Sequence, residues 1–207
     1  GVDEPYRMFT SRAEYRILLR QDNADQRLTP IGYSIGLADE SRIKKMESKK
    51  ENIERLIHFI KTNNALPEEV NKSFEELNTP IITQKTKLSQ LLLRPQINLD
   101  ILKNNVPYLN AEINKTPTEI KSQVEECAEI LVKYESYIKK EEEIVSKLSH
   151  FENLVIKDDF DYHSLKSLSF EAREKLTKIR PKTIGQAGRI SGVSPADISV
   201  LVIYISR

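Results

Sequence analysis

The stretch TPTEIKSQVEECAEILVKYESYIKKEEEIVSKL, residues 116–148, decides the fold class. Its apolar positions alternate steps of four and three along the chain, and only Glu141 interrupts them. Sustained heptads of this kind predict a coiled coil or a long helix in a bundle. Thr116 and Pro117 supply an N-cap and a first-turn proline for its start. The predicted seam consists of Ile120, Val124, Cys127, Leu131, Tyr134, Ile138, Val145 and Leu148.

A second helix is predicted over residues 39–62, where Asp39 can act as the N-cap. Its apolar positions have the same rhythm of three and four, and Lys50 fills one place in that seam. This helix could therefore pack antiparallel against the heptad stretch. Its apolar seam positions are Ile43, Met46, Ile53, Ile57 and Ile60.

The remaining segments on the N-terminal side are shorter. Thr29 and Pro30 predict the N-cap and first position of a helix that ends near Gly36. Residues 67–76 and 84–93 are predicted to be short helices, because prolines interrupt this part of the chain. Glycine supplies only 6 of the 207 residues, which favours helix over a turn-rich β fold. We expect an all-α fold: irregular short helices plus long heptad-patterned helices in a bundle, ending in a small C-terminal helical subdomain.

The C-terminal end differs from the middle of the chain in charge. Residues 166–207 carry 8 Lys and Arg against 3 Asp and Glu, whereas residues 117–165 carry 6 Lys against 12 Asp and Glu. Ser194 and Pro195 predict a helix start, and Asp197 suits its first turn. A basic segment of short helix, turn and helix can bind nucleic acid, contact a partner protein or simply close the bundle. The helices predicted there span residues 169–179, 183–190 and 195–206.

Arginines mark the N-terminal segment. Arg12, Arg16 and Arg20 are four residues apart, so on a helix they would form one stripe. Arginine offers forked donors that suit phosphate groups, which makes the stripe a candidate nucleic-acid contact. The alternative is that nearby Asp and Glu side chains hold these arginines in ion pairs.

Several kinds of chemistry are disfavoured. The glycines form neither a GxGxxG nor a Walker loop, and the three histidines are far apart, so we expect no cofactor or metal site. Cys127 is the one cysteine and lies in the predicted apolar seam, which favours a core position over a nucleophile. The longest apolar run, residues 200–205, is too short to cross a membrane. The chain is expected to be a binding module without catalytic residues.

Two long segments resemble one family. EPYRMFTSRAEYRILLRQDNADQRLTPIG (residues 4–32) and KIRPKTIGQAGRISGVSPADISVLVIYI (178–205) are similar to signatures of the MnmG, or GidA, family of flavin-dependent tRNA wobble-uridine modification enzymes. KYESYIKKEEE (133–143) and DYHSLKSLSFEAREKL (161–176) also fit the family pattern. Small departures occur at Ser136, Ser167 and Gly188, where the family pattern has Gly, Gly and Ser, and Lys139-Lys140 replaces Arg-Gln.

The resemblance implies that this chain is the C-terminal helical region of a longer cytoplasmic enzyme. That enzyme would use FAD, NADH and a folate to attach a carboxymethylaminomethyl group to the tRNA wobble uridine, together with the GTPase MnmE. The FAD and insertion domains, with the catalytic cysteines, would lie outside this chain, and a homodimer of the intact protein is possible. The regions expected are a junction segment to the FAD domain (1–36), a helical bundle (37–165) and a basic C-terminal subdomain (166–207).

The resemblance also assigns roles within the chain, namely docking MnmE and helping to bind tRNA. The alternatives are a helical spacer that supports the flavin domain and, less favoured, a self-contained enzyme. The candidate tRNA contacts are Arg12, Arg16, Arg20, Arg180 and Lys182. The candidate partner contacts are Gln186, Gly188, Arg189 and Ile190.

Overall fold

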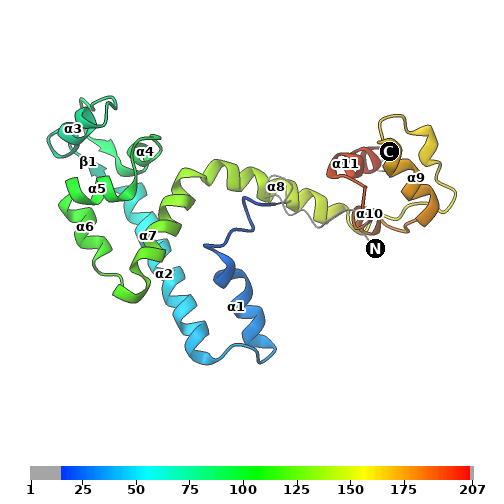
Figure 1. Ribbon diagram of the computed structural model, residues 1–207, viewed down its shortest axis with the longest axis horizontal. Helices are drawn as coiled ribbons and strands as arrows, with labels where there is room; N and C mark the ends of the chain where they lie inside the picture. Colours follow the sequence, from blue (N-terminus) through cyan, green and yellow to red (C-terminus); the bar gives the residue numbers. More distant parts are fainter. Residues whose placement is uncertain (1–14, 206–207) are drawn as a thin grey trace, which may run out of the picture. The chain divides into compact units, whose positions relative to one another are not determined.

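The computed structural model describes residues 15–205, apart from the side chains of residues 147–150. The chain divides into two compact units, Gly1–Lys139 and Lys140–Arg207, and the division falls within helix α8 (Glu135–Phe151) (Figure 1). The expected all-α class is confirmed, because the strands of the described part are two residues long. None of the described helices is long and apolar enough to cross a membrane.

The N-terminal unit is built on two helices that pack together, α2 (Glu40–Thr62) and α7 (Thr118–Lys133). The predicted cap of α2 is confirmed, since the Arg42 backbone N–H donates to Asp39 Oδ1 at 2.8 Å. The predicted place of Lys50 in the seam is wrong: Lys50 is exposed, and Lys49 is buried instead. Lys49 can be buried because its ammonium contacts the Asp22 carbonyl and the Asp25 carboxylate, and the periodicity of α2 does not reveal these partners.

Short helices complete this unit around α2 and α7. The helix predicted over residues 67–76 is confirmed as α3, whereas the one predicted over 84–93 is reduced to α4. A minimal antiparallel ladder, which we did not predict, pairs β1 (Asn64–Ala65), just before α3, with β2 (Thr86–Lys87), just before α4. The Asn71 side chain accepts from the Ile82 N–H and donates to its carbonyl, both at 2.9 Å, and so tethers the intervening loop. The short helices are α3 (Pro67–Glu76), α4 (Leu88–Leu92), α5 (Leu99–Asn105) and α6 (Pro107–Ile113).

The heptad stretch forms two helices instead of one. The first, α7, buries Ile120, Val124 and Cys127 as predicted, and α8 begins after Tyr134. Tyr134 departs from helical geometry at φ −106° and ψ 11°, yet its N–H donates to Ile130 and its carbonyl accepts from Ile138. The hydrogen-bond ladder therefore continues across the break. With 51% of its surface exposed, Tyr134 is not part of a buried seam.

Helix α1 (Ala24–Ser34) begins earlier than predicted. Thr29 and Pro30 are not its N-terminus but lie in its interior, and Asn23 occupies the N-cap position. Pro30 has no N–H to donate to the preceding turn, yet α1 continues through it. A proline after a threonine therefore does not mark the start of this helix, which follows the loop organised by Asn23. The helix ends before Gly36, which adopts a left-handed φ of 77°.

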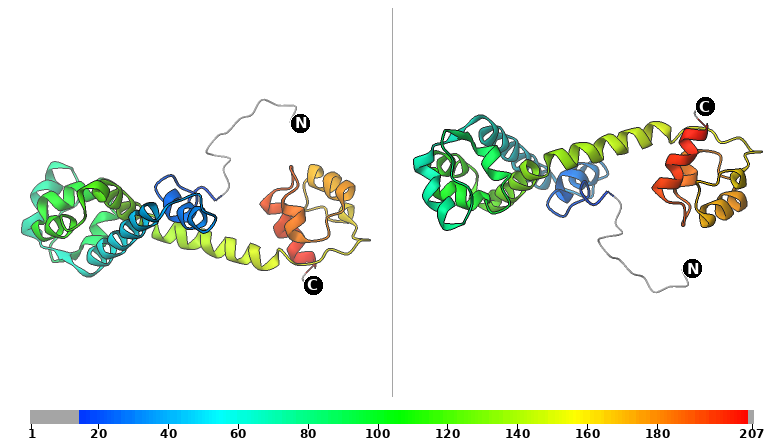
Figure 2. Two further views of the ribbon diagram at one scale, coloured as in Figure 1. Left: turned by 90° about the horizontal axis from the view of Figure 1, so that it is seen from below. Right: turned by 90° about the horizontal axis from the view of Figure 1, so that it is seen from above.

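The C-terminal unit confirms the three predicted helices as α9 (Phe170–Ile179), α10 (Ile184–Gly188) and α11 (Pro195–Ile205), with a 3₁₀ turn at Tyr162–Ser164 (Figure 2). The unit begins well before residue 166, where we expected the subdomain to start. Val155 pairs with Thr183, and the Ile156 N–H donates to the Lys182 carbonyl at 2.8 Å. Its core consists of Ile156, Tyr162, Leu165, Leu168, Ala172, Leu176, Ile184, Ala187, Ile198 and Leu201.

A buried carboxylate joins two helix starts in this unit. Asp197 is 4% exposed, and its Oδ1 accepts from the Ser169 N–H at 2.8 Å. Its Oδ2 accepts from the Ser194 N–H at 3.0 Å and the Ser194 hydroxyl at 2.6 Å, while the Ser169 hydroxyl lies at 3.3 Å. Ser169 and Ser194 immediately precede α9 and α11, so one side chain fixes both helices. Burial raises the pKa of Asp197, but these hydrogen bonds outweigh it and hold the pKa below its ordinary value.

Replacing Asp197 by alanine should destabilise the C-terminal unit by about 2–4 kcal/mol, because the backbone N–H groups of Ser169 and Ser194 at two helix starts lose their charged acceptor. Denaturant-dependent amide exchange in α9 and α11 measures this change. Glu174→Ala serves as the control, since Glu174 is an exposed acid on α9. Equal stability of the two variants would contradict this stabilising role of Asp197.

The same carboxylate should make the unit sensitive to acid. A carboxyl whose pKa is lower in the folded state stabilises the protein above its unfolded value of about 3.9, and the benefit disappears as the pH falls through the folded value. Stability of the C-terminal unit should therefore decline below about pH 4 more steeply in the native chain than in Asp197→Asn. Thermal unfolding between pH 2 and pH 7 tests this, and parallel profiles would rule it out.

Candidate nucleic-acid and partner interfaces

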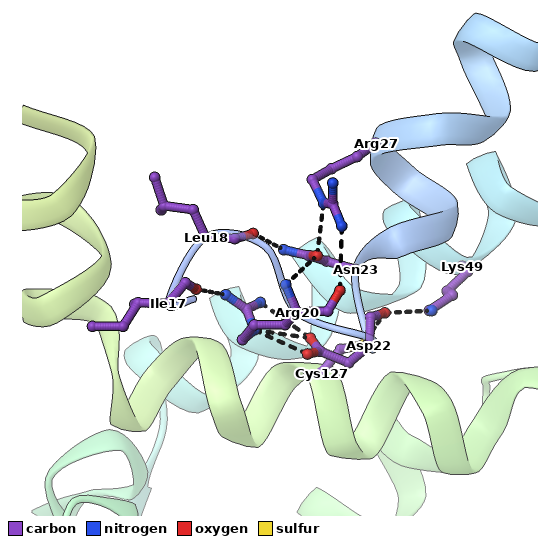
Figure 3. A network of polar contacts seen from close by, with 8 residues as sticks. All are labelled: Ile17, Leu18, Arg20, Asp22, Asn23, Arg27, Lys49 and Cys127. Atoms are coloured by element: carbon purple, nitrogen blue, oxygen red, sulfur yellow. Dashed lines mark hydrogen bonds and ion pairs between the residues drawn. The ribbon is translucent and has the colours of Figure 1, made fainter. Parts of the chain in front are cut away.

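The N-terminal arginines are partly committed to internal contacts. Arg20 pairs with Asp22 through its Nε at 2.9 Å, and its guanidinium also donates to the Ile17 carbonyl at 2.6 Å (Figure 3). Residues 15–18 form a turn, so the described part of the segment does not form the helical arginine stripe. Arg16 is exposed in this turn, and Arg12 lies outside the described residues. For Arg20 the ion-pair alternative is the one observed.

Asn23 organises the same turn. Its Oδ1 accepts from the Arg20 N–H at 3.2 Å and from Arg27 Nε at 3.0 Å, and its Nδ2 donates to the Leu18 carbonyl at 2.8 Å (Figure 3). These bonds fold residues 18–23 into a compact loop immediately before α1. The hydrogen bond to Asn23 holds the Arg27 side chain against this loop.

The loop is fastened to α2 and α7 at one carbonyl. The Asp22 carbonyl accepts from Lys49 Nζ of α2 at 3.0 Å and faces the Cys127 thiol of α7 at 3.4 Å. Lys49 also pairs with the Asp25 carboxylate at 2.8 Å. A pocket of about 590 Å³ adjoins this junction, and its lining includes Gln21, Asp22, Lys49, Glu126 and Cys127. We interpret this junction as structural, since its cation and thiol already have partners.

The C-terminal unit contains a second pocket, of about 510 Å³, with three cations in its lining. Two of them, Lys178 and Arg189, are exposed, and among the described residues neither side chain makes a hydrogen bond or ion pair. Lys175 donates to Glu171 Oε1 and to the Ser191 carbonyl, both at 2.6 Å. The lining consists of Lys175, Lys178, Ile179, Arg189, Ile190 and Ser191.

The turn beside this pocket requires glycine at Gly192. Its φ of 93° is left-handed, and an added Cβ would lie 2.2 Å from Glu171 Oε1 and 2.5 Å from Lys175 Nζ. The turn therefore approaches α9 closely enough for Lys175 to reach the backbone at Ser191. This contact places Arg189 and Ile190 next to the basic end of α9.

The structure separates the other predicted contacts from this pocket. Arg180 ends α9 in a left-handed conformation, and its guanidinium donates to the carbonyls of Asp158 and Phe160 and lies over the Tyr162 ring at 5.7 Å. Lys182 is exposed, and its backbone N–H donates to Gln186 Oε1 at 2.8 Å. Lys182 and Gln186 thus form a local pair that is not in the pocket lining.

Of the predicted partner contacts, Arg189 and Ile190 line the pocket. Gly188 is the last residue of α10, and a Cβ added to it would lie 3.7 Å from Ile198 Cγ1, an ordinary van der Waals distance. Sequence reasoning missed Lys175 and Lys178. Their spacing of three residues near the C-terminus of a predicted helix was the available signal, because it puts both on one face. Among the described residues, no cluster of three His, Cys, Asp or Glu side chains could hold a metal ion.

The structure predicts an unreactive cysteine. Burial raises the pKa of the Cys127 thiol to about 11, which outweighs the opposing effect of Lys49. Because only the thiolate reacts, alkylation by iodoacetamide at pH 7.5 should be at least about 100-fold slower in the folded protein than in urea. Mass spectrometry over time measures both rates, and rapid labelling of the folded chain would contradict the core assignment.

Comparisons with known proteins agree with this architecture. Residues 40–142 match a family model described as the tRNA modifying enzyme MnmG/GidA C-terminal helical domain, and residues 144–207 match the C-terminal helical bundle of the same enzyme. The boundary between the two models falls within α8, close to the division between the compact units.

Curated relatives match along the whole chain. It is 50% identical over 207 residues to the tRNA uridine 5-carboxymethylaminomethyl modification enzyme MnmG of Parabacteroides distasonis, and 52% identical over 208 residues to that of Cytophaga hutchinsonii. All of this chain is covered, but only 33% of each relative, so the chain spans about a third of their length.

A solved structure shares the fold. The form II crystal structure of Aquifex aeolicus GidA matches with a TM-score of 0.62 at 36% identity, covering 100% of this chain and 31% of that one. The form I crystal gives a TM-score of 0.59 over 99% of this chain. The chain therefore belongs to the MnmG/GidA family of tRNA modifying enzymes, in which it matches the C-terminal helical domain and the C-terminal helical bundle.

Proposed function

We propose that this chain acts in a full-length tRNA wobble-uridine modification enzyme by holding tRNA and by docking the GTPase partner MnmE. The carboxymethylaminomethyl chemistry, with FAD and NADH, belongs in this proposal to domains outside the chain, and the chain itself contributes no cofactor or catalytic residue. The enzyme is proposed to work in the cytoplasm and can form a homodimer through those other domains.

The observation that carries the proposal is the pocket of the C-terminal unit. Lys178 and Arg189 present exposed cationic groups at one opening, and Lys175 lies beside them. Cations grouped in this way are suited to phosphate oxygens, which provide affinity and register without reading sequence. Arg20 and Arg180 already donate to groups of this chain, so they are weaker candidates for phosphate contacts.

Partner docking is supported by the apolar part of the same surface. Ile179 is 54% exposed at the pocket, and Ile190 lines it together with Arg189. Arginine beside apolar side chains is a composition enriched in protein interfaces. The competing hypothesis is a purely structural spacer. A spacer would not require exposed cations or an exposed isoleucine at this place.

Reversing both free charges, in Lys178→Glu with Arg189→Glu, should weaken tRNA binding by the full-length protein about 10-fold or more at moderate salt. The slope of affinity against salt concentration should also become shallower, because fewer phosphate contacts release counterions. Fluorescence anisotropy with labelled tRNA, at several salt concentrations, measures both quantities. Capture of purified MnmE by the same variant tests the docking role.

Lys72→Glu with Lys87→Glu is the matched control, because it makes the same charge change at exposed lysines of the N-terminal unit. Circular dichroism establishes that both double variants remain folded. If the pocket variant binds tRNA and MnmE as the control does, the spacer hypothesis replaces the proposal. Loss of MnmE alone would reassign the pocket to partner docking.

A further inference from the structure

A groove of about 550 Å³ lies between the start of α5 and the solvent side of α7, within the N-terminal unit. Leu99 and Ile130 supply apolar surface to its lining. Tyr134, the residue that follows α7, also lines the groove and is 51% exposed. The function proposed above does not use this groove.

Two tyrosines form an exposed aromatic pair at the groove. The ring centroids of Tyr134 and Tyr137 are 6.2 Å apart, with an angle of 54° between the ring planes. Tyr137 is 60% exposed, whereas Val132, at the end of α7, is 4% exposed and belongs to the core. The core therefore does not use these two rings, and exposed tyrosine is a residue type enriched at binding hot spots.

Internal contacts hold two of the carboxylates that line the groove. Glu129 pairs with Lys133 at 2.9 Å and accepts from the Leu99 N–H at 2.8 Å, which fastens α7 to the start of α5. Glu125 pairs with Lys103 of α5 at 2.8 Å. These contacts fix the walls of the groove, so its shape does not depend on a ligand.

The other two carboxylates of the lining face solvent. The Asp100 side chain is 69% exposed and shares Lys103 with Glu125. Glu126 is exposed, and among the described residues its carboxylate makes no hydrogen bond or ion pair. Four carboxylates thus face two ammonium groups, Lys103 and Lys133, which leaves two negative charges in excess.

We propose that this groove docks a basic segment of a partner protein, with an arginine or lysine side chain placed beside Tyr134. The excess carboxylates attract a cation, and the tyrosine ring offers it a cation–π contact. Leu99 and Ile130 accept the apolar part of the same side chain. The inference goes beyond the function proposed above, because the basic pocket of the C-terminal unit suits ligands of the opposite charge.

Other occupants fit the groove less well. The carboxylates repel the phosphates of RNA. In the described part of the chain, these acids also do not form a group that could hold a metal ion. A second copy of the chain, or another part of the full-length polypeptide, is distinguished from a partner protein by the second experiment below.

Peptide binding to the full-length protein tests the charge and the place of the site. The probe is a short fluorescein-labelled peptide of repeating Leu-Arg-Ala units, and the same peptide with Glu in place of Arg tests the charge. Fluorescence anisotropy should show that only the basic peptide binds. Tyr134→Ala with Glu126→Lys should weaken this binding at least about tenfold, because the ring and the free carboxylate are lost.

Leu93→Ala with Glu51→Lys is the matched control, since it truncates another exposed apolar side chain and reverses another exposed acid of the same unit. It should bind the basic peptide as the native protein does, and circular dichroism verifies that both variants are folded. Equal affinity of the two double variants would overturn the proposal, as would equal binding of the acidic peptide.

Photo-crosslinking in cells identifies the source of the occupant. Tyr137→p-benzoylphenylalanine is introduced into the full-length protein, and the crosslinked product is sequenced by mass spectrometry. The proposal expects a peptide of a different protein with Arg or Lys at the attachment point. A peptide of the same polypeptide or of a second copy, crosslinked RNA, or no crosslink would each overturn it. These outcomes are independent of the measurements on Lys178→Glu with Arg189→Glu, so the two proposals can fail separately.

Discussion

The C-terminal unit depends on the buried carboxylate of Asp197. Four donors from Ser169 and Ser194 surround it, so the starts of α9 and α11 cannot move apart without leaving a buried charge unsatisfied. The basic pocket lies between the far end of α9 and the turn that leads into α11. Its cations are therefore arranged by a structural anion that does not itself line the pocket.

Local signals in the sequence were sufficient for much of the fold. Asp39 before α2, and Ser194 with Pro195 at the start of α11, predicted those helix starts, because a cap is made by residues adjacent in sequence. Pro30 and Tyr134 misled the prediction, since a proline can lie inside a helix and a heptad pattern continues across a local break. The β1–β2 ladder and the early start of the C-terminal unit rest on pairings between distant residues, which periodicity does not encode.

The candidate sites were predicted less completely, for a related reason. Composition located the basic segment, and Arg189 and Ile190, two of the predicted partner contacts, line one pocket of the structure. Sequence could not reveal that the Arg180 side chain turns back onto Phe160, nor that Arg20 is paired with Asp22. A cation is free to bind a ligand only where no carbonyl or carboxylate of the chain contacts it. Those contacts depend on the fold and are not visible in the sequence.

The junction at the Asp22 carbonyl has a consequence for the order of folding during synthesis. Its two donors, Lys49 and Cys127, lie 27 and 105 residues further along the chain. During translation the loop before α1 emerges ahead of α2 and α7, and it cannot complete this junction until α7 has left the ribosome. Contacts of such sequence separation form late. Until then Asp22 lacks the contact from α7, and the loop before α1 is held by α2 alone.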